Sequence, residues 1–187
     1  MTTSPIVESV PSSPPTWQGR WADEADTQAF AQRLAASAAL GHATLALHGD
    51  LGAGKTTLVR HLLRGLGVSG RIKSPTYAVV EPHSAQPAWN VGPLPVWHFD
   101  FYRFNDPREW EDAGFRDIFA SPGLKLVEWP EKAAAVMGPI DAELWLQTDD
   151  SANAGDSDSD APREVTLRAH TPTGRTLLAA VQSPHAA

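Results

Sequence analysis

Several features that would point to particular classes of protein are scarce or missing in this chain of 187 residues. It has no cysteine, which excludes disulfide bonds and thiolate metal sites. No apolar run approaches the ~20 residues that a membrane-spanning helix needs. Residues 1–16 have neither the basic residues nor the apolar block of a secretory signal. The formal net charge is −7, whereas free-standing nucleic-acid binders usually carry a basic face. We therefore expect a soluble cytoplasmic protein that does not bind membranes, in which any RNA would be held by another protein.

The length and composition predict one domain with a short tail. A domain of about this size buries roughly 70% of its unfolded surface and can hold a real core. Residues 1–16 are rich in Pro, Ser and Thr, which predicts a disordered tail before a single domain at 17–187. Residues 83–95 and 148–162 are expected to be loop insertions at the surface of that domain. The second insertion is acidic, but it lacks the EF-hand pattern with its closing Glu, so a solvated loop is the better interpretation.

The stretch G-D-L-G-A-G-K-T at residues 49–56 has the G-x-x-x-x-G-K-T pattern of a phosphate-binding P-loop. It follows the short apolar run 44–48, which suits a buried strand, and precedes residues 57–66, where leucines recur at helical spacing. Backbone N–H groups of such a loop close around an anion at a helix N-terminus. Lys55 is expected to reach the β- and γ-phosphates, and the Thr56 hydroxyl to bind Mg²⁺. The predicted nucleotide contacts of the loop are Gly49, Asp50, Leu51, Gly52, Ala53, Gly54, Lys55, Thr56 and Thr57.

Two apolar runs further along the chain predict strands with carboxylates near their ends. Asp100 lies in the run 96–102, and Glu128 lies in the run 124–129. Because open α/β sheets bind ligands at the carboxyl ends of their strands, both carboxylates are expected beside the P-loop. One would hold Mg²⁺ or its waters, and the other would orient or activate an attacking water. The residues leave open which of the two contacts the metal, and either could instead be a strand-end cap or an ion-pair partner.

Other polar and aromatic residues allow two or more interpretations. The Thr76 hydroxyl could reach the metal or the γ-phosphate, as in switch segments, or belong to an ordinary Ser-Pro-Thr turn. His98 could pair with Asp100 in a metal site, position Asp100, or be a hydrogen-bonded core histidine. Arg103 could compensate phosphate charge or form a surface ion pair, and Trp129 could stack on another ring or belong to the core. No Asn/Thr-Lys-x-Asp segment for guanine recognition occurs, so ATP is favoured over GTP.

The remaining pattern completes a predicted α/β fold. The expected class is a P-loop NTPase-like three-layer domain, with a central mixed, mainly parallel sheet flanked by helices. Further helices are expected at 23–40, where Gly41 would end the helix, and at 107–119, 130–137 and 174–182. Further strands are expected at 17–21 and 77–80 and in an antiparallel pair around residues 144–146 and 165–167.

Four segments together resemble one family, the TsaE (YjeE-type) P-loop ATPases of bacterial tRNA threonylcarbamoyladenosine biosynthesis. They are G-D-L-G-A-G-K-T-T at 49–57, K-S-P-T-Y at 73–77, H-F-D-F-Y-R at 98–103 and V-E-W-P-E at 127–131. The P-loop alone would be unspecific, but the order of all four in a short chain is specific, and the resemblance covers roughly residues 17–147. It implies a compact domain that binds ATP and Mg²⁺. It also implies two partners, TsaD and TsaB, which attach threonylcarbamoyl to adenosine 37 of tRNA, so that tRNA is met only through the complex.

The resemblance also implies roles for individual residues. In that family, ATP hydrolysis serves turnover of the partner complex. The matching positions here imply Lys55 and Thr56 as phosphate and metal ligands, Glu128 as the metal-side carboxylate and Asp100 as the acid needed for hydrolysis. They also imply Thr76 as a switch-like residue and Thr27 as a threonine near the nucleotide. We therefore expect a Mg²⁺-dependent ATPase that is slow without its partners.

Two other functions are compatible with a P-loop. One is a small kinase, although such kinases usually carry a basic lid, and no arginine occurs between Arg116 and Arg163. The other is a non-catalytic, nucleotide-dependent scaffold, against which Lys55 and the two carboxylates argue.

Overall fold

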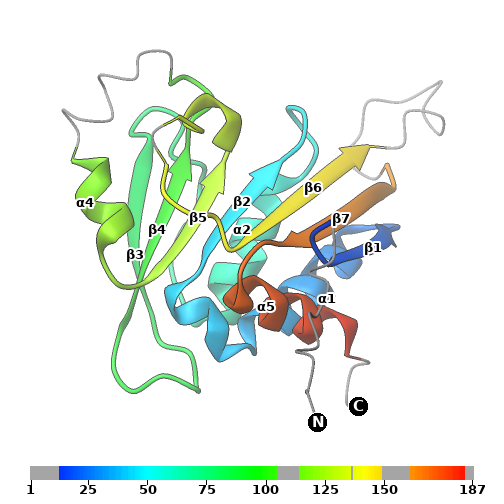
Figure 1. Ribbon diagram of the computed structural model, residues 1–187, viewed down its shortest axis with the longest axis horizontal. Coiled ribbons are helices and arrows are strands. Elements are labelled where there is room, and N and C mark those ends of the chain that lie inside the picture. Colours follow the sequence, from blue (N-terminus) through cyan, green and yellow to red (C-terminus); the bar gives the residue numbers. More distant parts are fainter. Residues whose placement is uncertain (1–12, 105–113, 136, 149–160, 184–187) are drawn as a thin grey trace, which may run out of the picture.

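The computed structural model describes residues 13–104, 114–135, 137–148 and 161–183. They form seven strands with helices packed around them (Figure 1). The elements are β1 (Thr16–Trp21), α1 (Glu24–Ala35), η1 (Ala38–His42), β2 (Thr44–His48), α2 (Lys55–Gly65), β3 (Val80–Ala85), β4 (Leu94–Asp100), α4 (Phe115–Ala120), β5 (Leu124–Glu128), η2 (Pro130–Lys132), β6 (Ala142–Thr148), β7 (Arg163–Ala169) and α5 (Pro172–Gln182). Among the described residues, no helix is long and apolar enough to cross a membrane.

All seven strands form one mixed sheet in the order β1-β7-β6-β2-β5-β4-β3. The inner strands β6, β2, β5 and β4 pair in parallel, whereas β3 at one edge and β7 and β1 at the other pair antiparallel. The expected α/β class with a mixed, helix-flanked sheet is confirmed, and parallel pairing is confined to those inner strands. Strand β5 is buried along its whole length, as is typical of a parallel strand covered on both faces.

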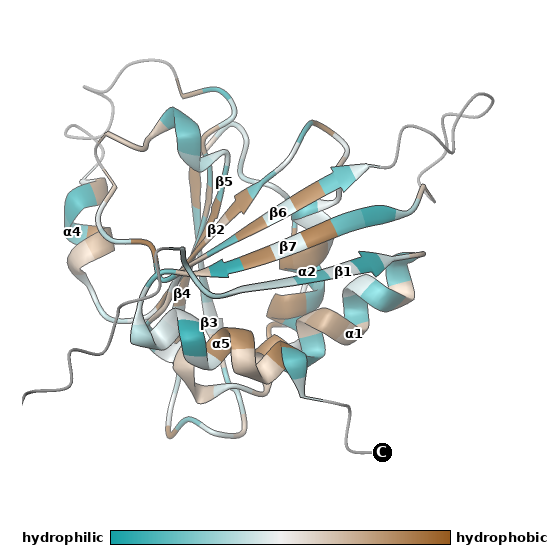
Figure 2. Ribbon diagram, turned by 45° about the vertical axis from the view of Figure 1, so that its right-hand side comes forward, coloured by the Kyte–Doolittle hydropathy of each residue, from teal (hydrophilic) through white to brown (hydrophobic). Residues whose placement is uncertain are grey.

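The sheet separates two hydrophobic clusters. The larger one joins α1, α2 and α5 to the strands, with Phe30 and Leu58 among its fully buried side chains. Figure 2 shows hydrophobic residues concentrated along the central strands and on α2 and α5. The smaller cluster centres on Phe99, whose ring meets Phe115 edge-on at 5.5 Å between centroids. Val96 belongs to the first cluster and Phe99 to the second, so Asp100, an even number of residues from Val96, faces the α2 side of the sheet.

The N-terminal and C-terminal predictions agree largely with the structure. Strand β2 has the predicted bounds, β1 begins one residue before its predicted start, and β6 and β7 form the predicted antiparallel pair. Helix α5 begins at Pro172, where the Thr171 hydroxyl accepts a hydrogen bond from the Gly174 N–H. The helix expected at 23–40 is too long, because α1 ends at Ala35. Ser37 has an extended backbone and interrupts the helix, and Leu40 belongs to the separate 3₁₀ turn η1. Leu40 is buried there, so its burial results from tertiary packing and not from the periodicity of α1.

The predictions for the middle of the chain need correction. The strand expected at 77–80 is wrong, because β3 runs from Val80 to Ala85 and Tyr77 lies in the preceding turn. The loop expected at 83–95 is wrong at both ends, which belong to β3 and β4. Composition hid β3 because it contains Pro82, but β3 is an edge strand, where a missing N–H is tolerated.

Three further expectations are limited by what the structure describes. Of the helix expected at 107–119, residues 107–113 lie outside the described residues and the rest contributes to α4 from Phe115. Of the helix expected at 130–137, residue 136 lies outside the described residues, and the described part forms only the 3₁₀ turn η2 over its first three residues. Residues 1–12 of the expected tail and 149–160 of the acidic insertion lie outside the described residues, while Thr148 belongs to β6.

Candidate functional site

The P-loop connects the end of β2 to the start of α2, as its sequence predicts. Gly49 has a φ of +140°, and a Cβ there would collide with the backbone oxygen of Leu146 in β6. Gly52 and Gly54 also have positive φ angles, of +86° and +100°. Helix α2 begins at Lys55, so its first N–H groups lack partners within the helix and its dipole favours an anion at this end. The loop therefore has the backbone geometry of a phosphate cradle.

Lys55 is buried against the loop that contains it. Its Nζ donates hydrogen bonds to the carbonyl oxygens of Gly49, at 2.5 Å, and Asp50, at 2.9 Å. The same ammonium lies 3.9 Å from the centroid of the Trp129 ring, a cation–π contact. Burial lowers the pKa of Lys55, and nearby carboxylates, Glu128 foremost, oppose this shift. Lys55 thus lies among acceptors that an anion entering the loop could replace.

Glu128 closes the other side of the first turn of α2. Both of its carboxylate oxygens accept hydrogen bonds from the Thr56 hydroxyl group, at 3.0 and 2.9 Å. The His98 Nε2 lies 2.8 Å from Oε1 of Glu128, one of the two oxygens that also accept from Thr56, and both side chains are almost fully buried. His98 is therefore a hydrogen-bonded core histidine, but the carboxylate it fixes is Glu128 and not the expected Asp100.

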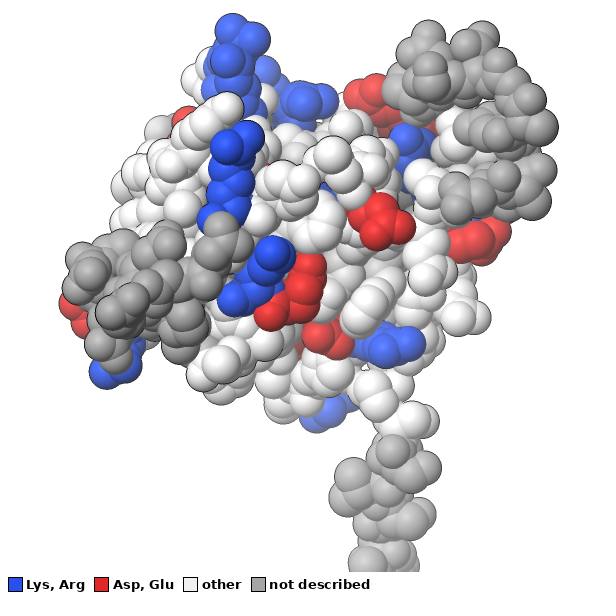
Figure 3. Space-filling model, turned by 90° about the horizontal axis from the view of Figure 1, so that it is seen from above, with Lys and Arg blue, Asp and Glu red and all other residues white. Residues whose placement is uncertain are grey.

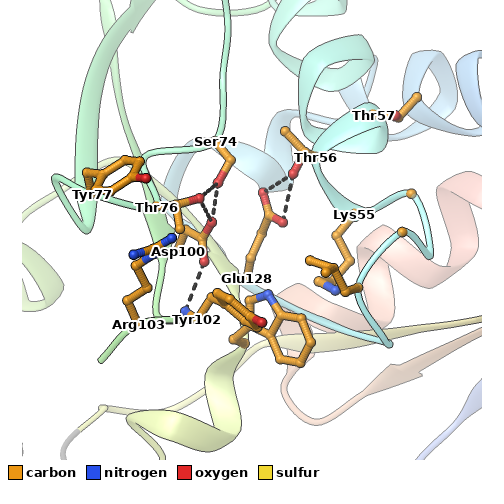
Figure 4. A pocket seen from close by; sticks show the side chains of 14 residues that line it. Lys55, Thr56, Thr57, Ser74, Thr76, Tyr77, Asp100, Tyr102, Arg103 and Glu128 are labelled. Carbon is orange, nitrogen blue, oxygen red and sulfur yellow. Dashed lines mark hydrogen bonds between the residues drawn. The ribbon is translucent and has the colours of Figure 1, made fainter. Parts of the chain in front are cut away.

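Asp100 is held by a different set of donors. It accepts hydrogen bonds from the Thr76 hydroxyl at 2.8 Å, from the Ser74 hydroxyl and from the Tyr102 N–H at 2.9 Å. Figure 4 shows Asp100 turned toward Ser74 and Thr76, and Glu128 turned toward Thr56. Asp100 and Glu128 are register partners on the parallel strands β4 and β5, so the two predicted carboxylates lie side by side.

Most predicted site residues line one cavity of about 610 Å³. They are Leu51, Gly52, Gly54, Lys55, Thr56, Thr57, Thr76, Asp100 and Glu128, together with Arg103 and Trp129. Gly49 and Asp50 contribute the carbonyl groups that hold Lys55, and Ala53 is buried beneath the loop. Thr27 does not line the cavity. It is a buried residue of α1, so its proximity to a nucleotide stays a prediction.

Tyr77, Tyr102, Arg103 and Trp129 also line the cavity, and the sequence left the roles of Arg103 and Trp129 open. Tyr77 is 85% exposed, and the Arg103 guanidinium lies 4.5 Å from the centroid of its ring. Trp129 lies 5.0 Å from Tyr102, centroid to centroid, and adopts a left-handed backbone with a φ of 58°. Its ring therefore packs at a tilt of 51° against Tyr102 at the site, and it is also the surface over which Lys55 lies.

Three residues that line the cavity, Ser74, Tyr77 and Tyr102, have no role predicted from the sequence. Ser74 belongs to the K-S-P-T-Y segment, and its hydroxyl donates a hydrogen bond to Asp100. Tyr102 donates its backbone N–H to Asp100, and a backbone contact of this kind cannot be predicted from a side-chain pattern. The spacing of Ser74 and Thr76, which allows two hydroxyls to reach one acceptor, was the available signal for Ser74.

The donors that could hold a metal here are oxygens. Thr56, Glu128 and Asp100 offer one hydroxyl and two carboxylates, which suit a hard cation such as Mg²⁺. Within the described part of the chain, no three His, Asp or Glu side chains converge as a preformed metal cage. This donor set therefore fits a cation that shares its coordination with substrate phosphates and water. Figure 3, which views the molecule from above relative to Figure 1, shows Lys and Arg side chains interspersed with acidic and uncharged ones.

A second cavity of about 490 Å³ adjoins the P-loop and shares Trp129 with the first. Its wall includes His48, whose ring stacks on Trp145 with 3.9 Å between the ring centroids and 4° between the ring planes. His48 also contacts Glu143 at 3.2 Å and Glu131 at 3.6 Å. Burial lowers the pKa of His48, although the two carboxylates act in the opposite direction and Arg168 reinforces the shift.

The lowered pKa of His48 predicts a loss of stability in mild acid. Between the folded pKa and the ordinary value of 6.5, the unfolded chain binds more protons, so the free energy of unfolding falls as pH drops through this window. His83 has a lowered pKa and adds a loss of the same sign. Urea unfolding at several pH values should show this loss, and His48→Gln should reduce it. An identical pH dependence in wild type and variant would contradict the assignment to His48.

Comparisons with known proteins point to one family. The sequence model described as "Threonylcarbamoyl adenosine biosynthesis protein TsaE" matches residues 21–157. A Haemophilus influenzae protein named tRNA threonylcarbamoyladenosine biosynthesis protein TsaE is 38% identical over 134 residues, which cover 72% of this chain and 75% of that protein. A Bacillus subtilis protein of the same name is 41% identical over 104 residues, which cover 56% of this chain and 60% of that protein. The crystal structure of Bacillus subtilis YdiB superposes with a TM-score of 0.64 and 26% identity, covering 90% of this chain and 95% of that one. The chain thus belongs to the TsaE family.

Proposed function

We propose that this protein binds and hydrolyses ATP with Mg²⁺, as a component of the machinery that makes threonylcarbamoyladenosine at position 37 of tRNA. The observation that carries the enzymatic part is the pair of adjacent carboxylates, Asp100 and Glu128, facing a P-loop across one cavity. A site that only bound nucleotide would need the loop and Lys55. Two carboxylates at the phosphate end suit a site that also positions a cation and a water.

The side chains divide the work. Thr56 and Glu128 would hold Mg²⁺, which supplies charge neutralisation and alignment of the β- and γ-phosphates when bound. Lys55 would exchange its bonds to the Gly49 and Asp50 carbonyl oxygens for bonds to phosphate oxygens. Asp100 would orient the attacking water and accept its proton. The hydroxyls of Ser74 and Thr76 fix the Asp100 carboxylate, so the segment that carries them can couple its own position to hydrolysis.

The biological setting rests on the family. The relatives that support it are named for tRNA threonylcarbamoyladenosine biosynthesis. We propose TsaD and TsaB as the partners, a cytoplasmic location, and contact with tRNA only through the complex. The net charge of −7 supports that last point, because a free-standing tRNA-binding surface is usually basic.

The test follows the γ-phosphate of labelled ATP, with and without TsaD and TsaB. Release of labelled inorganic phosphate, accelerated by the partners, is expected. Transfer of the label to a small acceptor would identify a kinase instead. Nucleotide binding without phosphate release, even with the partners present, would identify a nucleotide-dependent scaffold.

Replacing Glu128 by Gln should separate metal binding from folding. Gln keeps the shape of the side chain and can still accept the hydrogen bond from His98, but it loses the charge that attracts a cation. The Mg²⁺ concentration for half-maximal hydrolysis should rise by at least about 10-fold, because even the outer-shell partners of a metal contribute that much to its affinity. Glu164→Gln is the matched control, because Glu164 is 58% exposed on β7. An unchanged Mg²⁺ requirement in Glu128→Gln would remove Glu128 from the metal site.

A further inference from the structure

One arginine reaches the P-loop from the C-terminal half of the chain. Arg163, the first residue of β7, donates a hydrogen bond from Nε to the Ala53 carbonyl oxygen at 3.0 Å. Its Nη1 donates to the carbonyl oxygen of Ala161, two residues earlier in the chain, at 2.9 Å. This second hydrogen bond helps to fix the orientation of the guanidinium. The two bonded residues, Ala53 and Arg163, are 110 positions apart in the sequence. A charged, planar donor therefore reaches from the start of β7 to the backbone of the anion cradle.

Gly54 lies against the same arginine side chain. A Cβ built on Gly54 would lie 3.1 Å from the Arg163 Nε and 3.6 Å from its Cδ. Gly54 also caps α2 with a φ of +100°, a conformation that favours glycine. The arginine side chain thus lies directly against the bare Cα of Gly54, at the point where the loop becomes helix.

The contact has a consequence for the donors of the cradle. In a trans peptide the carbonyl oxygen and the following N–H point in opposite directions, and the described chain contains no cis peptide bond. Holding the Ala53 oxygen on Arg163 therefore directs the Gly54 N–H away from Arg163. Gly54 lines the cavity, whereas Ala53 is buried. A charged donor on the carbonyl also polarises the peptide, which strengthens its N–H as a donor.

We propose that Arg163 is a positioning residue of the nucleotide site, one that holds the Ala53–Gly54 peptide with its N–H ready for a phosphate oxygen. This inference rests on the proposed nucleotide binding. It makes the affinity of the P-loop depend on the β6–β7 hairpin, although the sequence motif of the loop is complete without it. Lysine would supply a charge and donors on a single nitrogen, but not the two separate, coplanar nitrogens that bridge Ala53 and Ala161.

The experiment compares Arg163→Ala, Arg163→Lys and Arg175→Ala. Arg175 is an exposed residue of α5 and controls for the loss of one positive charge. The dissociation constant for Mg²⁺–ADP is measured by calorimetry, and Tm is measured without nucleotide. Arg163→Ala should raise the dissociation constant about tenfold, as expected for losing one charge-assisted contact. Arg163→Lys should restore part of the affinity, and Arg175→Ala should bind as wild type does. Tm should be similar in all variants.

Two outcomes would overturn the inference. One is wild-type affinity in Arg163→Ala. The other is a loss of affinity that accompanies a fall in Tm and is not relieved by lysine, because that would assign Arg163 to the stability of the hairpin. Failure of the proposed function is distinguishable from both, since wild type itself would then bind no Mg²⁺–ADP.

Discussion

Replacing Asp100 by Asn is expected to lower kcat for ATP hydrolysis by about 10²–10⁴-fold, the usual contribution of a general base, while ATP still binds. The substitution preserves the size of the side chain, and the amide oxygen can still accept hydrogen bonds from Ser74 and Thr76. It removes the charge that can take a proton from water. Because Lys55 and Thr56 are untouched, the phosphate cradle stays complete. Phosphate release and nucleotide affinity, measured on the same preparation, check both parts of the prediction.

Asp117→Asn is the matched control, because Asp117 is an exposed residue of α4 and the change in net charge is the same. Wild-type turnover in Asp100→Asn would exclude Asp100 as the base. Equal losses of turnover and affinity would point instead to a binding role. Thr76→Val offers a graded comparison. It removes one of the donors that fix Asp100, so turnover should fall by less than in Asp100→Asn.

The parts of the site that the sequence predicted are those encoded by local pattern. The P-loop motif lies between a buried strand and a helix, and parallel strands bring their carboxyl ends to one edge, so Asp100 and Glu128 could be placed beside it. The helix end at Ala35 and the strand β3 could not be predicted in the same way. There, burial of Leu40 and the edge position of Pro82 decide the structure, and both are tertiary facts.

The partner of His98 illustrates why contacts were harder to predict than elements. Residues i and i+2 of a strand share a face but are about 6.5 Å apart, whereas neighbouring strands are only about 4.8 Å apart. The short Asp100 side chain turns toward Ser74, while the longer Glu128 side chain on the adjacent strand meets His98. Arg163 presents the same difficulty at greater range, since no local pattern connects it to Ala53.

Replacing Lys55 is expected to produce the largest loss of nucleotide affinity of any single change at the site. Lys55→Ala should raise the dissociation constant for ATP by about 10–100-fold, the equivalent of losing hydrogen bonds to a charged group. Lys55 lies in the cradle, where it donates hydrogen bonds to the carbonyl oxygens of Gly49 and Asp50. It therefore has to exchange one set of acceptors for another rather than be ordered from solvent, which keeps the entropic cost of binding low.

Lys55→Met distinguishes charge from packing, because methionine keeps an unbranched side chain over the Trp129 ring and loses only the ammonium. Both variants should bind ATP with similarly reduced affinity if charge dominates. Lys132→Met, at an exposed position of η2, controls for the change in net charge. Wild-type affinity in Lys55→Met would contradict a phosphate-binding role for Lys55. The expected loss, combined with retained binding in Asp100→Asn, would assign affinity to the P-loop and chemistry to the strand-end carboxylate.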